Sequence, residues 1–367
     1  MKFSVNKNEL STAVGKLSRA VANKSSLPVL EGILFSAEDG RITMAAYNYE
    51  IGMKKELEAD CEDPGDIVIG AKLLLEIIRK MPEDTVTVEV GTNCVCHITS
   101  GSSSFDIVGQ PAEEFPEIPS AAGGKELKMP GSMLKAMVRQ TIFAVDEENA
   151  TPMYTGIYFE IESDYIKLVA LDGLRIALRT ETAKNETPMK FVITGRSLSE
   201  VFRMIEDESE TIAMSVSQNH MSFETDGYYL VSRLIEGNYL DYQTVIKKEE
   251  KIKLRLNANE INDIIERISL IINNPRNTPV RCTIEKGEMK FTCATTIGRA
   301  SDVAQIDYDG PKLEFGFNAR FMTDALKATE TDEINMIFNG DIAPIMIKPT
   351  AGDNFLYVVM PMRIRNG

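Results

Sequence analysis

The chain has no tryptophan and only two histidines, His97 and His220, among 367 residues. Both histidines lie in strand-like stretches, and neither is accompanied by a serine or cysteine nucleophile motif. The sequence also lacks a P-loop, a glycine-rich dinucleotide fingerprint, a Cys-x-x-Cys pair and a His-Glu-x-x-His motif. These absences argue against the common classes of nucleotide-, redox- and metal-dependent enzyme, and we predict no catalytic residue, cofactor or metal.

Cysteines are few and odd in number, at positions 61, 94, 96, 282 and 293. Cys94 and Cys96 are expected on one face of a strand, which is poor disulfide geometry, and alternation directs His97 away from both. No apolar run approaches the roughly 20 residues that span a bilayer. Residues 1–5 start a strand pattern rather than a signal peptide. We therefore expect a reduced, cytoplasmic protein without a membrane partner.

A strand followed by an amphipathic helix recurs six times along the chain. The first copy spans residues 3–21, and the second begins 64 residues later, at 67–81. Each helix is followed by short strands with turn residues between them. Six copies in register predict a repeating unit of strand–helix–strand–strand–strand. The four remaining copies start at residues 127, 191, 254 and 315.

Two such βαβββ units in each of three similar domains give an α+β fold. The predicted domains are residues 1–122, 125–247 and 251–367, joined by a flexible linker at 120–124 and a charged one at 247–251. One unit cannot cover its own sheet, so we expect two helices to pack side by side on one face of antiparallel sheet.

The net charge of −15 argues against a generally basic, nucleic-acid-coated surface, but its distribution is uneven. The predicted helices contain fourteen basic and seven acidic residues, so they carry +7 and the remainder carries −22. This favours a positive face that contacts phosphates without reading sequence, although lysine and arginine also populate ordinary exposed helix faces. Glu260, Asp263 and Glu266 argue against the DNA interpretation for one helix. The helices are predicted at 6–24, 70–81, 130–144, 194–205, 257–272 and 318–328.

The last strand-like stretch, residues 357–364, contains Pro361 between Met360 and Met362. Proline has no N–H for a strand ladder, so the strand must end there or lie at a sheet edge. Alone, the stretch favours an edge strand whose methionines fill core. The alternative is the lip of a groove for peptides, because methionine repacks readily against different partners.

Two motifs, Asp-Gly-Leu-Arg at 172–175 and Val-Val-Met-Pro-Met-Arg at 358–363, give the chain its resemblance to the bacterial β sliding clamp family. Leu-Pro-Val-Leu at 27–30 and Asn318 add to it, and the resemblance spans the whole chain. It implies the DNA clamp fold and a non-catalytic processivity subunit of DNA polymerase III. The implied assembly is a head-to-tail homodimeric ring around duplex DNA, with helices lining the hole and antiparallel sheets outside.

The resemblance also implies a groove between the second and third domains that binds short peptides of the polymerase III α subunit, the clamp loader, other polymerases and repair proteins. Leu174, Leu240 and Thr244 depart from residues common in the family and make this groove more apolar. Carried over position by position, the groove comprises Tyr154, Leu171, Gly173, Leu174, Arg175, Ile176, Leu240, Thr244, Val245, Asn318, Phe321, Ile342, Pro344, Val358, Met360, Pro361, Met362 and Arg363.

Two further residue sets follow from the resemblance. At the dimer interface it places Phe105 and Ile107 of one copy against Ile271 and Ile272 of the other. Residues 299–304 depart from the acidic pattern of several family members. The residues expected to face DNA are Lys7, Lys16, Arg19, Lys24, Lys72, Arg79, Lys80, Lys135, Arg139, Arg196, Arg203 and Arg320.

Two other classes of function remain open at this point. One is an α+β enzyme with unrecognised catalytic groups, which the absent motifs and the sixfold repeat disfavour. The other is a ring-shaped scaffold that never touches DNA, which the basic helices disfavour.

Overall fold

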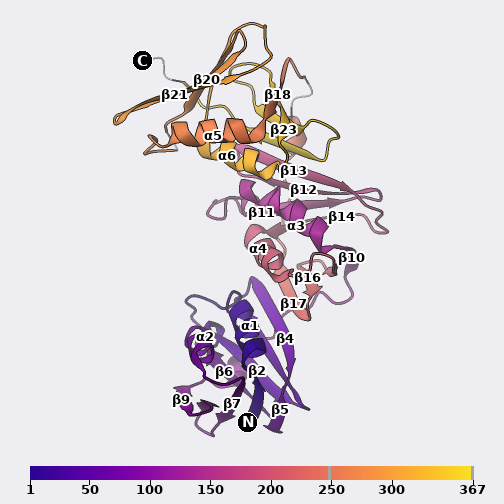
Figure 1. Cartoon of the computed structure of the whole chain (residues 1–367). Coiled ribbons are helices and arrows are strands. Elements are labelled where there is room, and N and C mark those ends of the chain that lie inside the picture. The colour runs from indigo at the N-terminus through magenta and orange to yellow at the C-terminus, as the bar shows by residue number, and fades with distance from the viewer. Residues whose placement is uncertain (247–248, 276, 365–367) are drawn as a thin grey trace. The chain divides into compact units, whose positions relative to one another are not determined.

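The computed structural model describes residues 1–246, 249–275 and 277–364, and its chain forms two compact units (Figure 1). Unit 1 comprises residues 1–134 and 197–234, and unit 2 comprises residues 135–196 and 235 onward. Lys247 and Lys248 of the predicted charged linker lie outside the described residues, as does the tail beyond residue 364.

The described residues contain six α-helices, one for each predicted copy of the repeat. Asparagine side chains cap three of them: Asn6, Asn257 and Asn318 accept hydrogen bonds from backbone N–H groups of the first turn. The helices are α1 (Lys7–Leu17), α2 (Ala71–Lys80), α3 (Gly131–Arg139), α4 (Gly195–Met204), α5 (Ala258–Ser269) and α6 (Ala319–Ala328).

Three helices are shorter than predicted. α1 ends at Leu17 rather than residue 24, because the Ser18 hydroxyl donates to the Val14 carbonyl at 2.6 Å and the chain then turns. Just after α3 the Thr141 hydroxyl donates to the Met137 carbonyl in the same way, and a separate 3₁₀ turn follows at Ile142–Ala144. α5 ends at Ser269, three residues early.

Unit 1 contains two antiparallel sheets. One has the order β5-β1-β7-β8-β9 and the other the order β10-β15-β16-β17-β4-β3-β2-β6. Their strands are β1 (Lys2–Asn6), β2 (Gly32–Glu38), β3 (Arg41–Tyr47), β4 (Ile51–Glu58), β5 (Asp60–Asp63), β6 (Gly65–Gly70), β7 (Thr85–Val90), β8 (Val95–Ser100), β9 (Ser103–Val108), β10 (Lys125–Pro130), β15 (Thr211–Val216), β16 (His220–Thr225) and β17 (Tyr228–Arg233).

Unit 2 also contains two antiparallel sheets, with the orders β14-β11-β12-β13-β25-β24-β23-β18 and β21-β20-β19-β22. Their strands are β11 (Gly156–Ile161), β12 (Tyr165–Leu171), β13 (Arg175–Thr182), β14 (Met189–Thr194), β18 (Ile252–Asn257), β19 (Val280–Glu285), β20 (Glu288–Thr295), β21 (Gly298–Gln305), β22 (Leu313–Phe317), β23 (Glu333–Phe338), β24 (Ile345–Pro349) and β25 (Phe355–Val359).

The element order confirms the predicted βαβββ unit, repeated six times. Strand β5 is the one addition: it pairs with β1 at a sheet edge, where its acidic side chains discourage further pairing. Helices α1 and α2 pack against each other, as do α5 and α6, and their apolar stripes are buried (Figure 1).

Two sheet junctions join successive predicted domains. In unit 1 strand β4 pairs with β17, and in unit 2 strand β13 pairs with β25. Each eight-stranded sheet therefore combines strands from two of the three predicted domains. For this reason the two compact units divide the middle of the sequence between them.

The terminal strand is placed differently from the edge position that its sequence suggested. β25 ends at Val359, two residues before Pro361, as the missing N–H requires. However, it lies inside its sheet, between β13 and β24. It pairs with the strand that starts at Arg175, so the two motifs at 172–175 and 358–363 lie next to each other.

Candidate functional site

The hairpin between β12 and β13 is shaped by the Asp-Gly-Leu-Arg motif. Asp172 Oδ1 accepts hydrogen bonds from the backbone N–H groups of Leu174 and Arg175 at 2.9 and 3.0 Å. Gly173 has φ = 88°, a conformation that glycine adopts without steric cost. The local sequence therefore suffices to form this turn.

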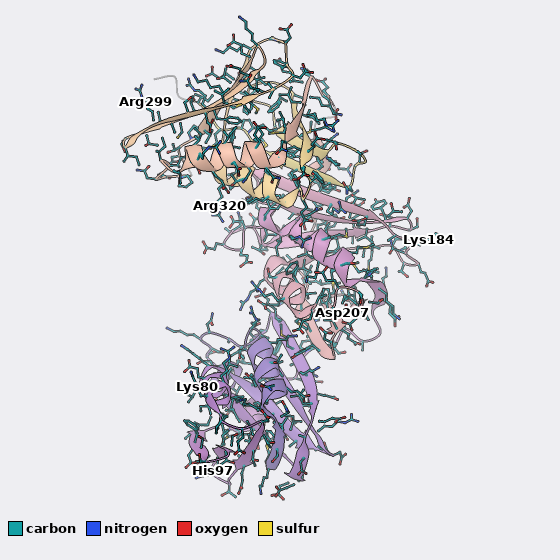
Figure 2. All side chains as sticks on the ribbon, viewed as in Figure 1. Lys80, His97, Lys184, Asp207, Arg299 and Arg320 are labelled. Atoms are coloured by element: carbon teal, nitrogen blue, oxygen red, sulfur yellow. The ribbon has the colours of Figure 1, made fainter. Side chains whose placement is uncertain are left out.

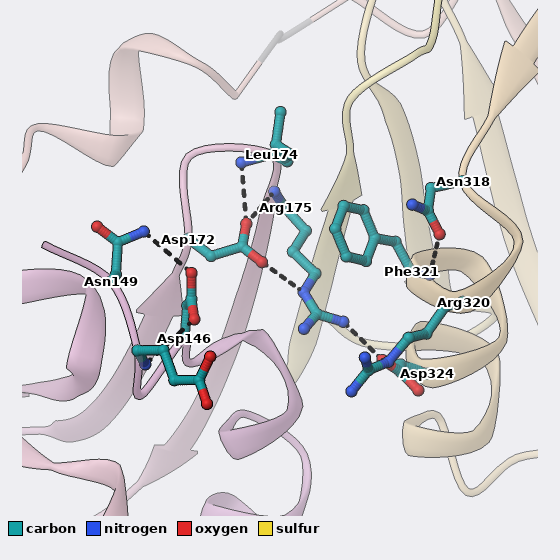
Figure 3. Close-up of polar contacts among 10 residues, drawn as sticks. Asp146, Asn149, Asp172, Leu174, Arg175, Asn318, Arg320, Phe321 and Asp324 are labelled. Carbon is teal, nitrogen blue, oxygen red and sulfur yellow. Dashed lines mark hydrogen bonds and ion pairs between the residues drawn. The ribbon is translucent and has the colours of Figure 1, made fainter. Parts of the chain in front are cut away.

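The Arg175 side chain braces this hairpin against helix α6 (Figure 3). Its Nε donates to Asp172 Oδ2 at 2.9 Å, and a terminal nitrogen donates to Asp324 Oδ2 at 2.7 Å. The guanidinium lies 4.5 Å from the ring centre of Phe321 and 5.7 Å from that of Phe143. The Arg175 side chain is only 7% exposed, so its contacts link the hairpin to α6 inside unit 2 and not at the surface.

Asn318 has a similar supporting role at the start of α6. Its Oδ1 accepts from the backbone N–H of Phe321 at 3.3 Å, and its Nδ2 donates to the Pro275 carbonyl at 3.1 Å. Its side-chain hydrogen bonds are thus directed to the backbone, and Asn318 is buried.

Beyond β25, the chain runs along the Asp172–Arg175 turn. The backbone N–H of Met360 donates to the Leu174 carbonyl at 2.8 Å, and that of Met362 donates to the Gly316 carbonyl at 2.8 Å. These two bonds fix the backbone on both sides of Pro361. Both methionines are half-buried.

Two tyrosines anchor the loop that carries Leu240 and Thr244. Tyr239 donates to the Val169 carbonyl at 3.1 Å, and Tyr242 donates to Glu160 at 3.2 Å. Burial raises the pKa of both phenols. Burial also favours the neutral form of Glu160, but the charge of Lys167 and the hydrogen bond from Tyr165 outweigh it and hold the pKa of Glu160 below its ordinary value.

All eighteen residues predicted for the groove lie in unit 2. Five of them belong to one apolar cluster: Leu171, Ile176 and Val358 are buried in it, with Tyr154 and Val245 packed against it. The other buried members are Arg175, Asn318 and Pro344; the half-buried ones are Phe321, Met360, Pro361 and Met362; and the exposed ones are Gly173, Leu174, Leu240, Thr244, Ile342 and Arg363.

An adjoining pocket of about 1450 Å³ was not predicted. Met362 and Arg363 form part of its wall, together with the basic residues Arg281, Lys290 and Arg299. Sequence reasoning also missed Asp324 and Phe143. The Asp-Gly-Leu-Arg motif signals the Asp172–Arg175 contact, but no local pattern signals a partner 149 residues away.

The twelve cations predicted to face DNA fall into two groups. Several are neutralised by carboxylates: Lys16 pairs with Glu206 at 2.6 Å, Arg19 and Arg203 pair with Glu200, Arg139 pairs with Glu330, and Arg320 pairs with Asp324. Lys7 donates to the Met81 carbonyl, and Lys135 and Arg196 also have partners. Among the described residues, Lys24, Lys72, Arg79 and Lys80 are exposed and form no ion pair.

Of these twelve cations, the ones without an ion pair therefore lie on α2 and just after α1. Arg19 and Lys24 follow α1 instead of lying on it, which corrects their predicted placement. The helices as the structure defines them contain twelve basic and seven acidic residues, and the excess comes from α1 to α4. Figure 2 labels Lys80 on α2 and Arg320 on α6.

The residues predicted for a dimer interface lie on an edge strand and just beyond the end of a helix. Phe105 and Ile107 belong to the edge strand β9, where Phe105 is 42% exposed. Ile271 and Ile272 follow the end of α5 and are half-buried. Strand β21, which contacts α5, is the corresponding free edge in unit 2.

Metal and membrane sites find no support in the described part of the chain. No group of three or more metal-ligating side chains occurs there, and none of its helices has the length and apolarity needed to cross a membrane.

Cys94 lies in a turn with φ = 60° before β8, and not on the strand face predicted for it. Cys96 is buried, and His97 contacts Asp106.

Comparison with known proteins identifies the family. Models of the DNA polymerase III beta subunit match its N-terminal domain at residues 1–119, its central domain at 128–241 and its C-terminal domain at 243–363. The beta sliding clamp of Bacillus subtilis (strain 168) is 29% identical over 378 residues, covering 99% of this chain and 100% of the relative.

Solved structures agree with this assignment. The Bacillus subtilis DNA polymerase sliding clamp aligns with a TM-score of 0.95 at 28% identity and 100% coverage of both chains. The Thermotoga maritima DNA polymerase III beta subunit aligns with a TM-score of 0.91 at 29% identity, covering 99% of this chain and 100% of that one. The chain belongs to the DNA polymerase III beta subunit family.

Proposed function

We propose that this chain is a DNA sliding clamp, a cytoplasmic, non-catalytic processivity subunit that encircles duplex DNA as a head-to-tail homodimeric ring. Its domains in this proposal are residues 1–122, 125–247 and 251–367. The three matched family models support this threefold division, although the C-terminal match begins earlier, at residue 243.

The observation that carries the proposal is the pattern of paired and free sheet edges. The junctions β4–β17 and β13–β25 join successive predicted domains, while β9 and β21, each the last strand of its own repeat, have one free edge. Unpaired edges with exposed apolar side chains are normally covered or joined to another strand. Joining β9 of one copy to β21 of another is a heterologous contact, and two such contacts close a ring of two chains.

A closed ring around the duplex keeps the clamp on DNA, so processivity does not require tight binding. Lysine and arginine near the duplex contact phosphates through a screened, sequence-independent attraction, which permits sliding. The negative remainder of the chain repels DNA elsewhere. Protein partners, in contrast, need a site that binds them with appreciable affinity. The surface formed by the predicted groove residues of unit 2 binds short peptides of polymerases, the clamp loader and repair proteins.

Retention on DNA tests the clamp proposal. After enzymatic loading, the protein should remain on circular duplex DNA and be lost from linear DNA of the same length, because a ring slides off free ends. Equal rates of loss from both templates, measured by gel filtration of labelled protein, would refute topological binding.

Substitution of Lys72, Arg79 and Lys80 with glutamine is expected to weaken the attraction to duplex DNA. Each phosphate contact contributes about 0.9 to the slope of log affinity against log salt, so three lost contacts lower that slope by up to about 3. Fluorescence anisotropy with a labelled linear duplex, recorded across a series of salt concentrations, measures this slope.

A matched variant controls for net charge. Lys128, Lys184 and Lys286 are exposed residues on a strand or in loops next to strands, outside the helices. Changing all three to glutamine removes the same charge and should leave the slope nearly unchanged. Equal slopes for the two triple variants would contradict the assignment of DNA contact to α2.

A further inference from the structure

The pocket beside the predicted groove lies on the solvent face of the sheet β21-β20-β19-β22. Lys290 and Thr292 of β20 line it, while Phe291 between them is buried. Phe291 is opposite Asp302, which pairs with Arg267 of helix α5 at 2.8 Å. Since side chains alternate between the two faces of a strand, α5 covers one face of this sheet and the pocket opens on the other.

The lining of this pocket is positively charged. Its four cations are Arg281, Lys290, Arg299 and Arg363, and none of the lining residues in the described part of the chain is acidic. The whole chain has 55 acidic and 40 basic residues, so the pocket is opposite in sign to the protein. Arg281 pairs with Glu314 at 3.3 Å. The other three cations are exposed and form no ion pair among the described residues.

Hydroxyl groups lie among these cations. Thr292 is directly opposite Arg281 on one side and Ser301 on the other, so the three residues form a row across β19, β20 and β21. Within the described residues, neither hydroxyl has a hydrogen-bond partner. Hydroxyls donate to anionic oxygens, so the row offers hydrogen bonds as well as positive charge to a carboxylate.

The pocket and the predicted groove share part of their walls. Met362 and Arg363 belong to both. The backbone N–H of Met362 donates to the Gly316 carbonyl at 2.8 Å, which holds the chain after β25 against strand β22. A Cβ on Gly316 would lie 3.0 Å from Ile364 Cγ1, so the glycine permits this close approach. A peptide that leaves the groove past Met362 therefore enters the pocket.

We propose that this pocket binds an acidic segment of a protein partner whose adjoining residues occupy the peptide groove. The proposal rests on the peptide binding proposed above and adds to it a second subsite, which selects for carboxylates. The acidic segment directly adjoins the groove-binding residues of the partner, because Met362 and Arg363 are common to the two sites.

The position of the pocket favours a peptide over duplex DNA. In the proposed clamp the helices face the duplex, whereas the pocket opens on the sheet face opposite α5. Lys290 also stays accessible in the proposed dimer. It lies on β20, one strand in from the free edge of β21, so a strand joined to that edge does not cover it.

Peptide extensions test the pocket. A labelled peptide from the C-terminal tail of a replicative polymerase is lengthened by four glutamates at one end or the other, with four glutamines as neutral controls. At low salt, one glutamate extension should increase the affinity about tenfold over its glutamine counterpart. The increase should disappear near 1 M salt, where charges are screened beyond about 3 Å. No increase from either extension would overturn the proposal.

A charge reversal locates the effect. Lys290→Glu should abolish the increase and leave the affinity of the unextended peptide unchanged, because Lys290 is not a groove residue. Lys184→Glu is the matched control, since Lys184 is also exposed in unit 2 but does not line the pocket (Figure 2). It should retain the increase. Equal loss in both variants would indicate a general attraction to the positive charges of the chain and would overturn the pocket assignment.

Two further measurements separate this proposal from the others. Lys290→Glu should leave the salt dependence of duplex DNA binding unchanged, and a fall of about 1 in that slope would assign the pocket to DNA instead. Failure of the unextended peptide to bind would refute the groove itself, and with it this proposal. Normal binding of that peptide without any gain from glutamate would refute the pocket alone.

Discussion

Replacing Arg175 with alanine is expected to destabilise unit 2 by about 3–5 kcal/mol, since removing one partner of a buried ion pair leaves an uncompensated charge. Arg175 and Asp172 are each 7% exposed at their side chains, and the change also removes the guanidinium from between Phe321 and Phe143. Urea unfolding followed by circular dichroism measures the loss, because the chain has no tryptophan to serve as a fluorescence probe.

Arg320 provides the matched control. It lies 3.8 Å from the same Asp324 carboxylate, but its side chain is 76% exposed. Exposed pairs contribute about 0–1 kcal/mol, so Arg320→Ala should shift the unfolding midpoint only slightly. Hydrogen exchange in β13 and β25 should increase for Arg175→Ala alone. Equal destabilisation by the two variants would argue against a bracing role for Arg175.

Combining Leu174→Asp with Met362→Ala is expected to reduce peptide affinity by roughly 30-fold or more. Central apolar contacts at interfaces often contribute about 2 kcal/mol or more each, and aspartate would also place a charge on the apolar surface. Leu174 is 55% exposed, so its replacement should have little effect on stability. Anisotropy of a labelled peptide from the C-terminal tail of a replicative polymerase provides the measurement.

The structure favours this pair over one that includes Arg175, since loss of Arg175 would disturb the fold and the surface together. Leu73→Asp is a suitable control, because Leu73 lies on α2 and is 53% exposed, nearly as much as Leu174. It should leave peptide binding unchanged. An unchanged affinity for the Leu174–Met362 variant would remove these residues from the peptide site.

The positions of the helices were predictable because apolar spacing within one turn is a local property of the sequence. All six occur where the spacing indicated, but α1 ends seven residues before the predicted end. The apolar pattern continues through Val21, whereas the Ser18 hydroxyl and the hydrogen bond from the Ala22 N–H to the Leu30 carbonyl decide where the helix stops. Helix ends depend on such individual contacts.

The candidate site was predictable only in part. Motifs predicted which residues form the surface, but not which contacts they make within the chain. Arg175 and Asn318 are predicted to contact a peptide, and the structure adds that their side chains hold the turn and the start of α6. Their partners, Asp324 and the Pro275 carbonyl, come from segments far away in sequence, so no local pattern could have identified them.

The sequence by itself determined the repeating unit, its six copies, and which face of each strand is buried, because side-chain alternation encodes all three. Only the tertiary structure decided which strands become neighbours. Alternation states which side chains face the core, but it does not state which backbone N–H and C=O groups meet. That choice joined β4 to β17 and β13 to β25, whereas β9 and β21, the other strands that end their repeats, each keep one free edge, and this difference is the basis for proposing a ring.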